Sequence, residues 1–93
     1  MVVATCRIEM FVPESGSLKG KRQVVKALKD RIRSRFNVSV AEVDHQDLWQ
    51  RATLGVAVVS NESAHADQTL AHVIRLVQQE PRLTVLDIQT EFR

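Results

Sequence analysis

The chain has 93 residues, of which 44% are hydrophobic and 26% charged, with a formal net charge of +2, so we expect one globular domain over residues 1–93. Its single cysteine excludes an internal disulfide and a zinc site made of several thiolates. No apolar run approaches the roughly 20 residues that span a bilayer, and no basic segment leads into an apolar one at the N-terminus, so we expect a cytoplasmic protein.

The first third of the chain predicts a strand followed by a helix. Apolar residues recur at every second position from Val2 to Val12, which is typical of a strand with one buried face. Pro13 and Gly16 end this strand. An apolar stripe of helical period then predicts a helix over 18–35, with Leu28 at the centre of its buried face.

The rest of the chain predicts two strands, a helix and a last strand. The strands cover about 37–44 and 52–60, and the polar segment 45–51 between them is either a hairpin tip or a strand extension. A phase shift in the apolar pattern predicts a bulge between Val40 and Ala41. Asn61 and Ser63 are candidate caps of the second helix, Pro81 stops it, and the last strand runs from Leu83 to Phe92.

The predicted order of elements is β-α-β-β-α-β. Two split βαβ units with right-handed crossovers give a four-stranded antiparallel sheet with both helices on one face. The expected class is therefore an α+β, ferredoxin-like fold. The first and third strands are the most apolar, so we place them at the centre of the sheet, and the more polar second strand at an edge.

Charge is distributed very unevenly along the chain. Segment 19–35 contains eight Lys or Arg residues and one acid, Asp30, whereas the remainder has five basic and ten acidic residues. On a helix, five of these cations fall within a sector of about 80° opposite Leu28, along roughly 21 Å. We call them the basic stripe: Lys19, Arg22, Lys26, Lys29 and Arg33. The stripe predicts contacts with an anionic partner, most often nucleic acid, and the alternative is a plain solvated helix face.

The turn before this helix resembles a phosphate-binding loop only in part. The segment from Gly16 to Arg22 contains two glycines and two lysines, but it is one residue shorter than the nucleotide-binding motif. Arg22 also stands where that motif needs a hydroxyl for magnesium. We therefore expect no nucleotide hydrolysis, with Lys21 and the turn amides assisting phosphate contacts and Ser17 acting as helix cap.

The polar segment between the middle strands is a second candidate contact. If it is extended, alternation directs four side chains to one side: His45, Asp47, Trp49 and Arg51. A tryptophan among polar residues favours base stacking or a protein contact. The alternative is that Trp49 folds back over the end of the sheet.

The sequence contains few features that favour catalysis or a cofactor. Cys6 belongs to the inward set of the first strand, so we expect an inert thiol. His65 and His72 lie about 10.5 Å apart along a helix, too far to share a metal ion. We therefore predict no enzyme activity, no catalytic residues, no metal site and no cofactor.

The face of the sheet that carries no helices is expected to be flat, with small and apolar side chains. The third strand directs Thr53, Gly55, Ala57 and Val59 outward, with no aromatic residue among them. Ferredoxin-like modules that read single-stranded RNA stack bases on aromatic side chains at this place, so that mode is not expected. Pairing of this face with a second copy of the chain is the alternative that it suggests.

Three stretches together resemble one known family. They are residues 17–22 (SLKGKR), residues 37–43 (NVSVAEV) and residues 45–52 (HQDLWQRA) followed by Leu54 and Gly55. This pattern, which covers essentially the whole chain, is similar to the YlxP-like family, small bacterial proteins built on a domain of unknown function. The resemblance implies a ferredoxin-like fold, a cytoplasmic bacterial protein and, from the neighbouring translation and ribosome-maturation genes of the family, work near RNA. It implies no catalytic residues.

The leading hypothesis is a non-catalytic protein that binds structured RNA or the ribosome through the basic stripe, with Lys21 assisting and the segment 45–51 as a second contact. Such binding is expected to be weakly sequence-specific and salt-sensitive. Two alternatives stay open. One is a homodimeric protein-interaction module that uses the open sheet face and the Trp49 segment, and the other is a small-ligand regulator.

Overall fold

The computed structural model describes residues 1–13 and 16–93, and it contains the six predicted elements in the predicted order. The strands are β1 (Val2–Phe11), β2 (Ser39–Asp44), β3 (Arg51–Ser60) and β4 (Thr84–Phe92), and the helices are α1 (Leu18–Arg35) and α2 (Ser63–Gln78). The bounds of α1 coincide with the predicted ones, and those of the strands differ by one or two residues.

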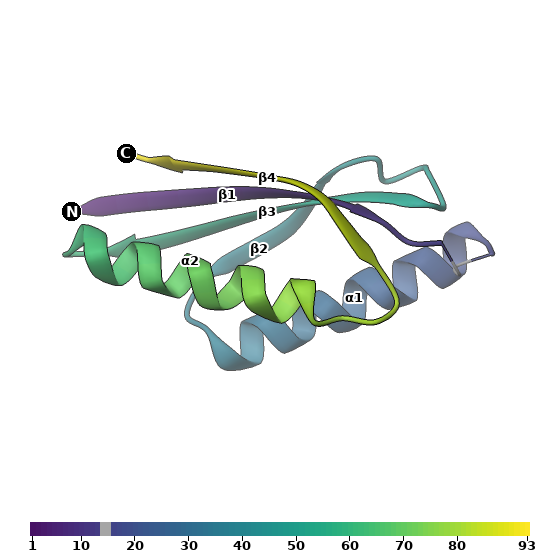
Figure 1. Cartoon of the computed structure of the whole chain (residues 1–93), viewed down its shortest axis with the longest axis horizontal. Helices are drawn as coiled ribbons and strands as arrows, with labels where there is room; N and C mark the ends of the chain where they lie inside the picture. Colours follow the sequence, from purple (N-terminus) through teal and green to yellow (C-terminus); the bar gives the residue numbers. More distant parts are fainter. Residues whose placement is uncertain (14–15) are drawn as a thin grey trace.

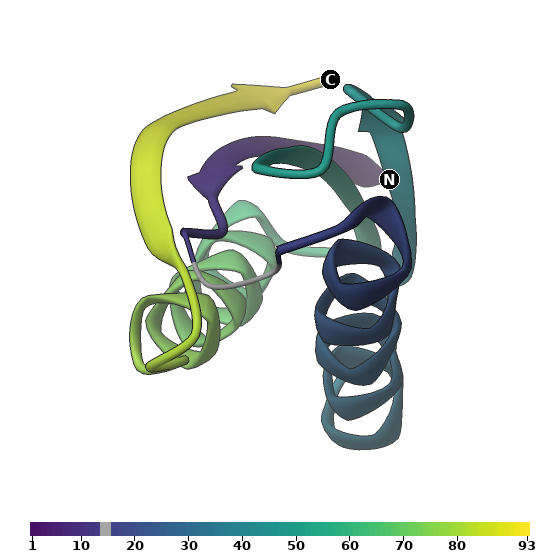
Figure 2. The same cartoon turned by 90° about the vertical axis from the view of Figure 1, so that its right-hand side faces the viewer.

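The four strands form one antiparallel sheet in the order β2-β3-β1-β4. Both helices lie on the same side of this sheet, and the other side is open (Figure 1, Figure 2). The predicted ferredoxin-like fold is therefore confirmed, with β1 and β3 central and β2 and β4 at the edges. No helix among the described residues has the length and apolar character needed to cross a membrane.

The core lies between the sheet and the two helices. Every second residue of β1 from Ala4 to Met10 is buried, because strand alternation directs these side chains to the helices. The buried face of α1 is centred on Leu28, which has no exposed surface, and α2 contributes a matching stripe centred on Val73. The spacing of apolar residues in the sequence thus identifies the faces of β1, α1 and α2 that pack in the core.

The two helices begin in different ways. Ser17 is the N-cap of α1, and its side chain accepts a hydrogen bond from the amide of Gly20 at 3.0 Å, as expected. The N-cap of α2 is Glu62, whose side chain makes no capping bond, so the expected caps Asn61 and Ser63 are wrong. Instead, the Ser60 hydroxyl accepts from the Glu62 amide at 3.1 Å just before the helix begins.

The bulge in β2 lies further along the strand than the apolar pattern indicates. The register between β2 and β3 shifts between Glu42 and Asp44, and not between Val40 and Ala41, so Val43 is the extra residue. A Cβ atom on Gly55 of β3 would lie 2.8 Å from Cγ1 of Val43, which explains why this strand has a glycine there. A second shift in β4, opposite Glu9 and Met10, leaves Leu86 as an extra residue.

A buried carboxylate joins α1 to the turn before β4. The side chain of Glu80 is 3% exposed and accepts from Nε of Arg82 at 2.7 Å and from Nη1 of Arg31 at 3.0 Å. Hydrogen bonds from the Arg82 side chain and backbone, together with both positive charges, hold the pKa of Glu80 below its ordinary value of 4.5, although burial opposes this shift. Arg31 is therefore engaged in holding the fold together.

The lowered pKa of Glu80 predicts a loss of stability in acid. Its ionised form contributes stability that is fully present above pH 4.5 and is lost as the pH falls through the lower pKa of the folded state. Glu80→Gln is expected to lower the free energy of unfolding at pH 7 and to flatten its fall in acid, measured by urea unfolding from pH 7 to pH 3. The exposed control Asp47→Asn should retain the wild-type slope, and an unchanged slope in Glu80→Gln would contradict the assignment.

Candidate functional site

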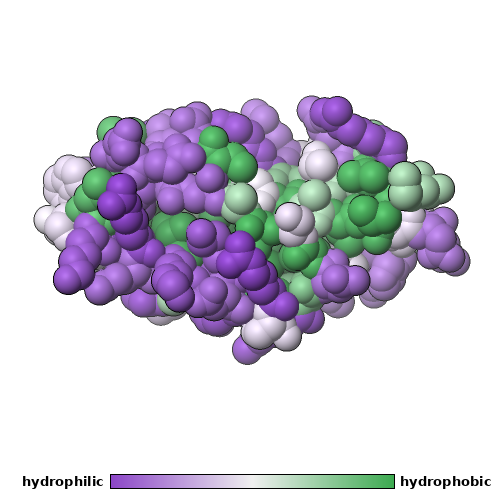
Figure 3. All heavy atoms as spheres, turned by 180° about the vertical axis from the view of Figure 1, so that it is seen from behind, coloured by the Kyte–Doolittle hydropathy of each residue, from purple (hydrophilic) through white to green (hydrophobic). Residues whose placement is uncertain are grey.

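The structure places the five cations of the basic stripe on the side of α1 that faces away from the core. Four of the side chains are exposed and that of Lys29 is partly buried. The helical period alone positions them, because the opposite side of the helix packs on the sheet. In Figure 3, which views the molecule from behind, hydrophilic side chains cover the lower part, where α1 lies.

A groove runs between α1 and the edge strand β2, with a volume of about 450 Å³. Four stripe residues form its helix wall, and the strand side contributes a carboxylate and an amide. The charged and polar residues that line it include Arg22, Lys26, Lys29, Arg33, Glu42 and Gln46. The stripe therefore borders a depression, a feature that the linear spacing of the cations does not indicate.

Only part of the positive charge of the stripe is neutralised within the molecule. Lys26 pairs with Asp30 at 3.0 Å, as expected from their spacing, and Arg33 lies 3.9 Å from the same carboxylate. Within residues 1–13 and 16–93, no carboxylate pairs with Lys19, Arg22 or Lys29. Three cations on one helix face are thus free to meet an external anion.

Lys21 is not on this surface, which corrects its expected role in phosphate contacts. Its side chain has no exposed surface, and its ammonium group lies 2.7 Å from Oε2 of Glu42. It also donates to the carbonyls of His45 at 3.1 Å and Gln46 at 3.2 Å. One signal in the sequence predicts this position, because seven residues before Leu28 correspond to only about 20° on a helix.

The ammonium of Lys21 ties the β2–β3 connection to the start of α1. Three hydrogens of an ammonium match the three acceptors that surround it, so the buried charge is fully satisfied. Figure 2 shows this connection standing over the N-terminal end of α1. The two predicted contact regions, the stripe and the segment 45–51, are therefore held together by one side chain.

The segment 45–51 is a turn followed by the start of β3, so the hairpin-tip alternative is confirmed and the extended one is wrong. His45 has a φ of 62°, and this left-handed backbone breaks the expected alternation. At the tip, the side chains of Leu48 and Trp49 are 48% and 44% exposed, and Asp47 is exposed as well. Trp49 is thus partly accessible to solvent, and the turn removes the strand alternation that was expected to align it with His45 and Arg51.

His45 and Arg51 belong instead to a polar network on the open sheet face. Nδ1 of His45 lies 2.8 Å from Oγ1 of the buried Thr53, and Glu9 lies 3.3 Å from Nη2 of Arg51. Arg7 continues the network to Asp44 at 3.1 Å. The backbone amide of His45 and then Arg7 lower the pKa of the Asp44 carboxyl, so it stays ionised.

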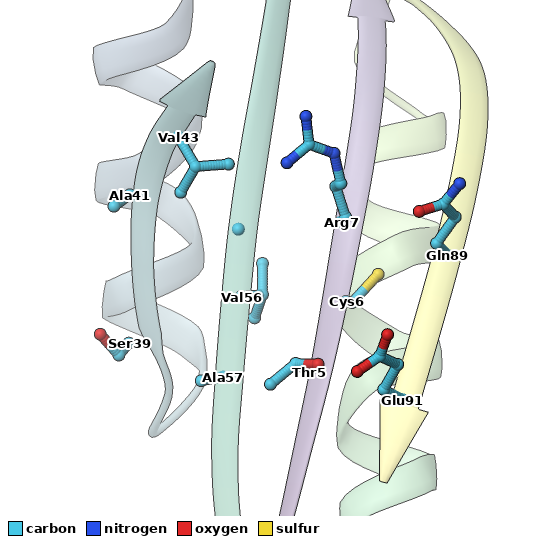
Figure 4. Close-up of a pocket in the computed structure, with 11 residues that line it drawn as sticks. Thr5, Cys6, Arg7, Ser39, Ala41, Val43, Val56, Ala57, Gln89 and Glu91 are labelled. Atoms are coloured by element: carbon cyan, nitrogen blue, oxygen red, sulfur yellow. The ribbon is translucent and has the colours of Figure 1, made fainter.

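Beyond this network, the open face has a shallow trough of about 450 Å³ (Figure 4). Small residues of β2 and β3 form its floor, and Arg7 and Glu91 border it from β1 and β4. Its lining among the described residues consists of aliphatic, small and polar side chains. The face is thus mostly small and apolar, as expected, but hollowed instead of flat.

Cys6 and His72 lie in packed parts of the fold. Among the described residues, no group of three His, Cys, Asp or Glu side chains could hold a metal ion. Cys6 is 2% exposed, and burial raises the pKa of its thiol to about 11. His72 lies beside Phe36, with ring centroids 6.4 Å apart, in a contact between the two helices.

Comparison with known proteins shows the family. Residues 3–90 match the family described as "Protein of unknown function (DUF503)", and the chain belongs to this family. The chain is 32% identical over 91 residues to the uncharacterized protein YlxP of Bacillus subtilis strain 168, covering 98% of this chain and 99% of that one. The predicted YlxP-like membership is therefore confirmed.

Two solved structures match the chain at low sequence identity. A de novo designed protein with a ferredoxin fold, solved by NMR, is 12% identical, with a TM-score of 0.49 over 100% of this chain and 86% of that one. A crystal structure of a Shewanella oneidensis protein is 17% identical, with a TM-score of 0.47 over 97% of this chain and 88% of that one.

Removal of Lys21 is expected to destabilise the fold strongly, because it leaves the Glu42 carboxylate, 13% exposed, without its partner. Lys21→Met should lower the free energy of unfolding by about 3–5 kcal/mol, and Lys21→Met combined with Glu42→Leu should recover much of this loss. Urea unfolding of the single and double variants measures the coupling. Lys19→Met is the exposed control and should stay within about 0.5 kcal/mol of wild type; equal losses in Lys19→Met and Lys21→Met would refute the assignment.

The buried thiol of Cys6 is expected to resist alkylation. A rise in pKa from 9.0 to about 11 leaves roughly 100-fold less thiolate at pH 8, and burial further restricts access. Iodoacetamide labelling followed by mass spectrometry should be at least that much slower in the native protein than in urea. Fast labelling of folded protein would show that the thiol is accessible.

Proposed function

We propose that this protein binds structured RNA, such as that of the ribosome, through phosphate contacts made by the basic stripe, and that it is not an enzyme. The observation that carries the proposal is the lack of internal carboxylate partners for Lys19, Arg22 and Lys29 within the described residues. Like charges at helical spacing repel each other, so an isolated molecule gains nothing from this arrangement. An external polyanion supplies the missing partner.

The dimensions of the stripe agree with a series of phosphates. It extends roughly 21 Å along α1, and the cations recur every three or four residues, about 4.5–6 Å apart. Contacts to phosphates fix position and register without reading bases, so binding is weakly sequence-specific. The groove beside β2 gives the RNA backbone a place to lie against the helix.

The hairpin tip is the proposed second contact. Trp49 and Leu48 are about half exposed, and the hydrogen bonds from Lys21 to the start of the hairpin hold it beside the first turn of α1. A tryptophan next to a basic surface suits stacking on an unpaired base or docking on a ribosomal protein. His45 and Arg51 support this tip through the polar network and do not contact the RNA themselves.

A second candidate function rests on the open sheet face. Its trough has a volume of about 450 Å³ and small side chains on its floor, which suits a second copy of the chain or a small ligand. If a second copy of the chain occupies this trough, the protein is a homodimeric interaction module; if a small ligand occupies it, the protein is a small-ligand regulator. Salt-resistant association without affinity for RNA would favour it over RNA binding.

The salt dependence of RNA affinity tests the leading proposal. In filter-binding assays with structured ribosomal RNA, the logarithm of the association constant should fall linearly with the logarithm of salt, with a slope of about −3 to −4 for four or five phosphate contacts. Arg22→Glu combined with Lys29→Glu should lower the affinity at least tenfold and make the slope shallower by about 2.

A matched control separates the stripe from net charge. Arg35→Glu combined with Arg75→Glu makes the same change in charge at another groove, where the end of α1 meets α2. This control should retain most of the affinity and the wild-type slope. No binding even at low salt, or equal losses in both double variants, would overturn the assignment to the stripe.

A further inference from the structure

The two edges of the sheet are protected to different degrees. On β2, Nη2 of Arg33 donates to the Val40 carbonyl at 2.8 Å, and the Gln46 amide donates to the Glu42 carbonyl at 3.3 Å. In the parts of the chain that the structure describes, no side chain hydrogen bonds to the backbone of β4. β4 also contains neither lysine nor proline, the residues that commonly block an edge.

The hydrogen-bond pattern shows which groups of β4 point away from the sheet. Arg93 and Val3 exchange both backbone hydrogen bonds, at 2.7 and 2.9 Å. In an antiparallel ladder such pairs alternate with residues whose N–H and C=O point the other way. The outer edge therefore presents the N–H and C=O groups of Ile88, Thr90 and Phe92.

We propose that a second copy of this chain pairs with this outer edge, antiparallel, with the two Thr90 residues opposite each other. In this register Ile88 lies opposite the partner's Phe92, and Asp87 lies opposite the partner's Arg93. The outward backbone groups of both copies then bond to each other. Phe92, which is 51% exposed, gains an aliphatic neighbour.

Charge selects this register over the neighbouring one. Centring the pair on Gln89 would place Asp87 opposite the partner's Glu91, and like charges directly opposite each other destabilise a sheet. Centring it on Thr90 instead brings together opposite charges, a Thr–Thr pair and two pairs of an aromatic with a β-branched side chain, Phe92 with Ile88. Within the chain, Arg93 pairs with Glu91 at 2.8 Å, and both side chains are well exposed. An exposed ion pair contributes little free energy, so Arg93 loses little when it leaves Glu91 and pairs with Asp87 of the other copy.

The resulting dimer has one continuous eight-stranded sheet. A two-fold axis perpendicular to the sheet keeps both pairs of helices on one face, as an isologous interface requires. α1 packs beside β2, at the far edge from the interface, so the two basic stripes stay exposed. The proposal is therefore independent of RNA binding and can succeed or fail without it.

A charge exchange between two variants tests the register. Sedimentation equilibrium over a concentration series should show a dimer for the wild type, and Asp87→Arg or Arg93→Asp alone should raise its dissociation constant at least about tenfold. An equimolar mixture of the two variants should form a heterodimer of about wild-type affinity, because each arginine then faces an aspartate. Failure of the mixture to associate would overturn the register.

A second pair of variants separates the edge from the open face. Thr90→Pro removes an outward N–H without removing a bond to β1, so the chain should stay folded by circular dichroism and lose the dimer. Ala57→Glu changes the trough and should leave the dimer intact. A monomeric wild type at concentrations up to about 1 mM, or a dimer lost in Ala57→Glu and retained in Thr90→Pro, would overturn the proposal. RNA affinity, measured in parallel, should be retained by Thr90→Pro.

Discussion

The buried ion pair between Lys21 and Glu42 is the constraint on which the candidate site depends. Burial of a charge is costly unless every hydrogen-bonding group is satisfied, and here the ammonium meets one carboxylate and two carbonyls. Those acceptors belong to β2 and to the start of the hairpin, whereas the lysine belongs to the first turn of the helix that bears the stripe. The start of α1 is therefore fixed at one point to β2 and to the hairpin, which follow it by more than twenty residues in the sequence.

The ion pairs distinguish Lys21 and Arg31 from the stripe residues of α1. Lys21 and Arg31 point to acids of the framework, Glu42 and Glu80, and so hold α1 against the edge strand and the turn after α2. Among the described residues, Asp30 is the one carboxylate that pairs with stripe residues, and Lys26 and Arg33 share it. Lys19, Arg22 and Lys29 thus carry charge that no carboxylate of the described residues neutralises, which is the physical basis for proposing an anionic partner.

The two edges and the open face of the sheet are covered by side chains to different degrees, and this asymmetry limits where other molecules can bind. Side chains from α1 and the hairpin close the edge at β2, so further strand pairing there would break existing hydrogen bonds. The polar network around Glu9 occupies one end of the open face, and small side chains leave a trough at the other. Within the described residues, β4 has no comparable cover, which is why it is the proposed site of self-association, whereas the exposed side of α1 is the proposed RNA-binding surface.

Local periodicity determined the elements and the stripe, because alternation and the helical repeat depend only on neighbouring residues. The strand from Val2, the helix over 18–35 and the outward sector of cations all follow from spacing. Lys21 shows how far local periodicity can predict. Its spacing from Leu28 places it on the buried side of the helix, but the carboxylate and carbonyls that stabilise a buried lysine come from distant segments that only the tertiary fold brings close. The bulge at Val43, the left-handed backbone of His45 and the cover of β2 were likewise decided by contacts between distant segments, whose energies no local pattern contains.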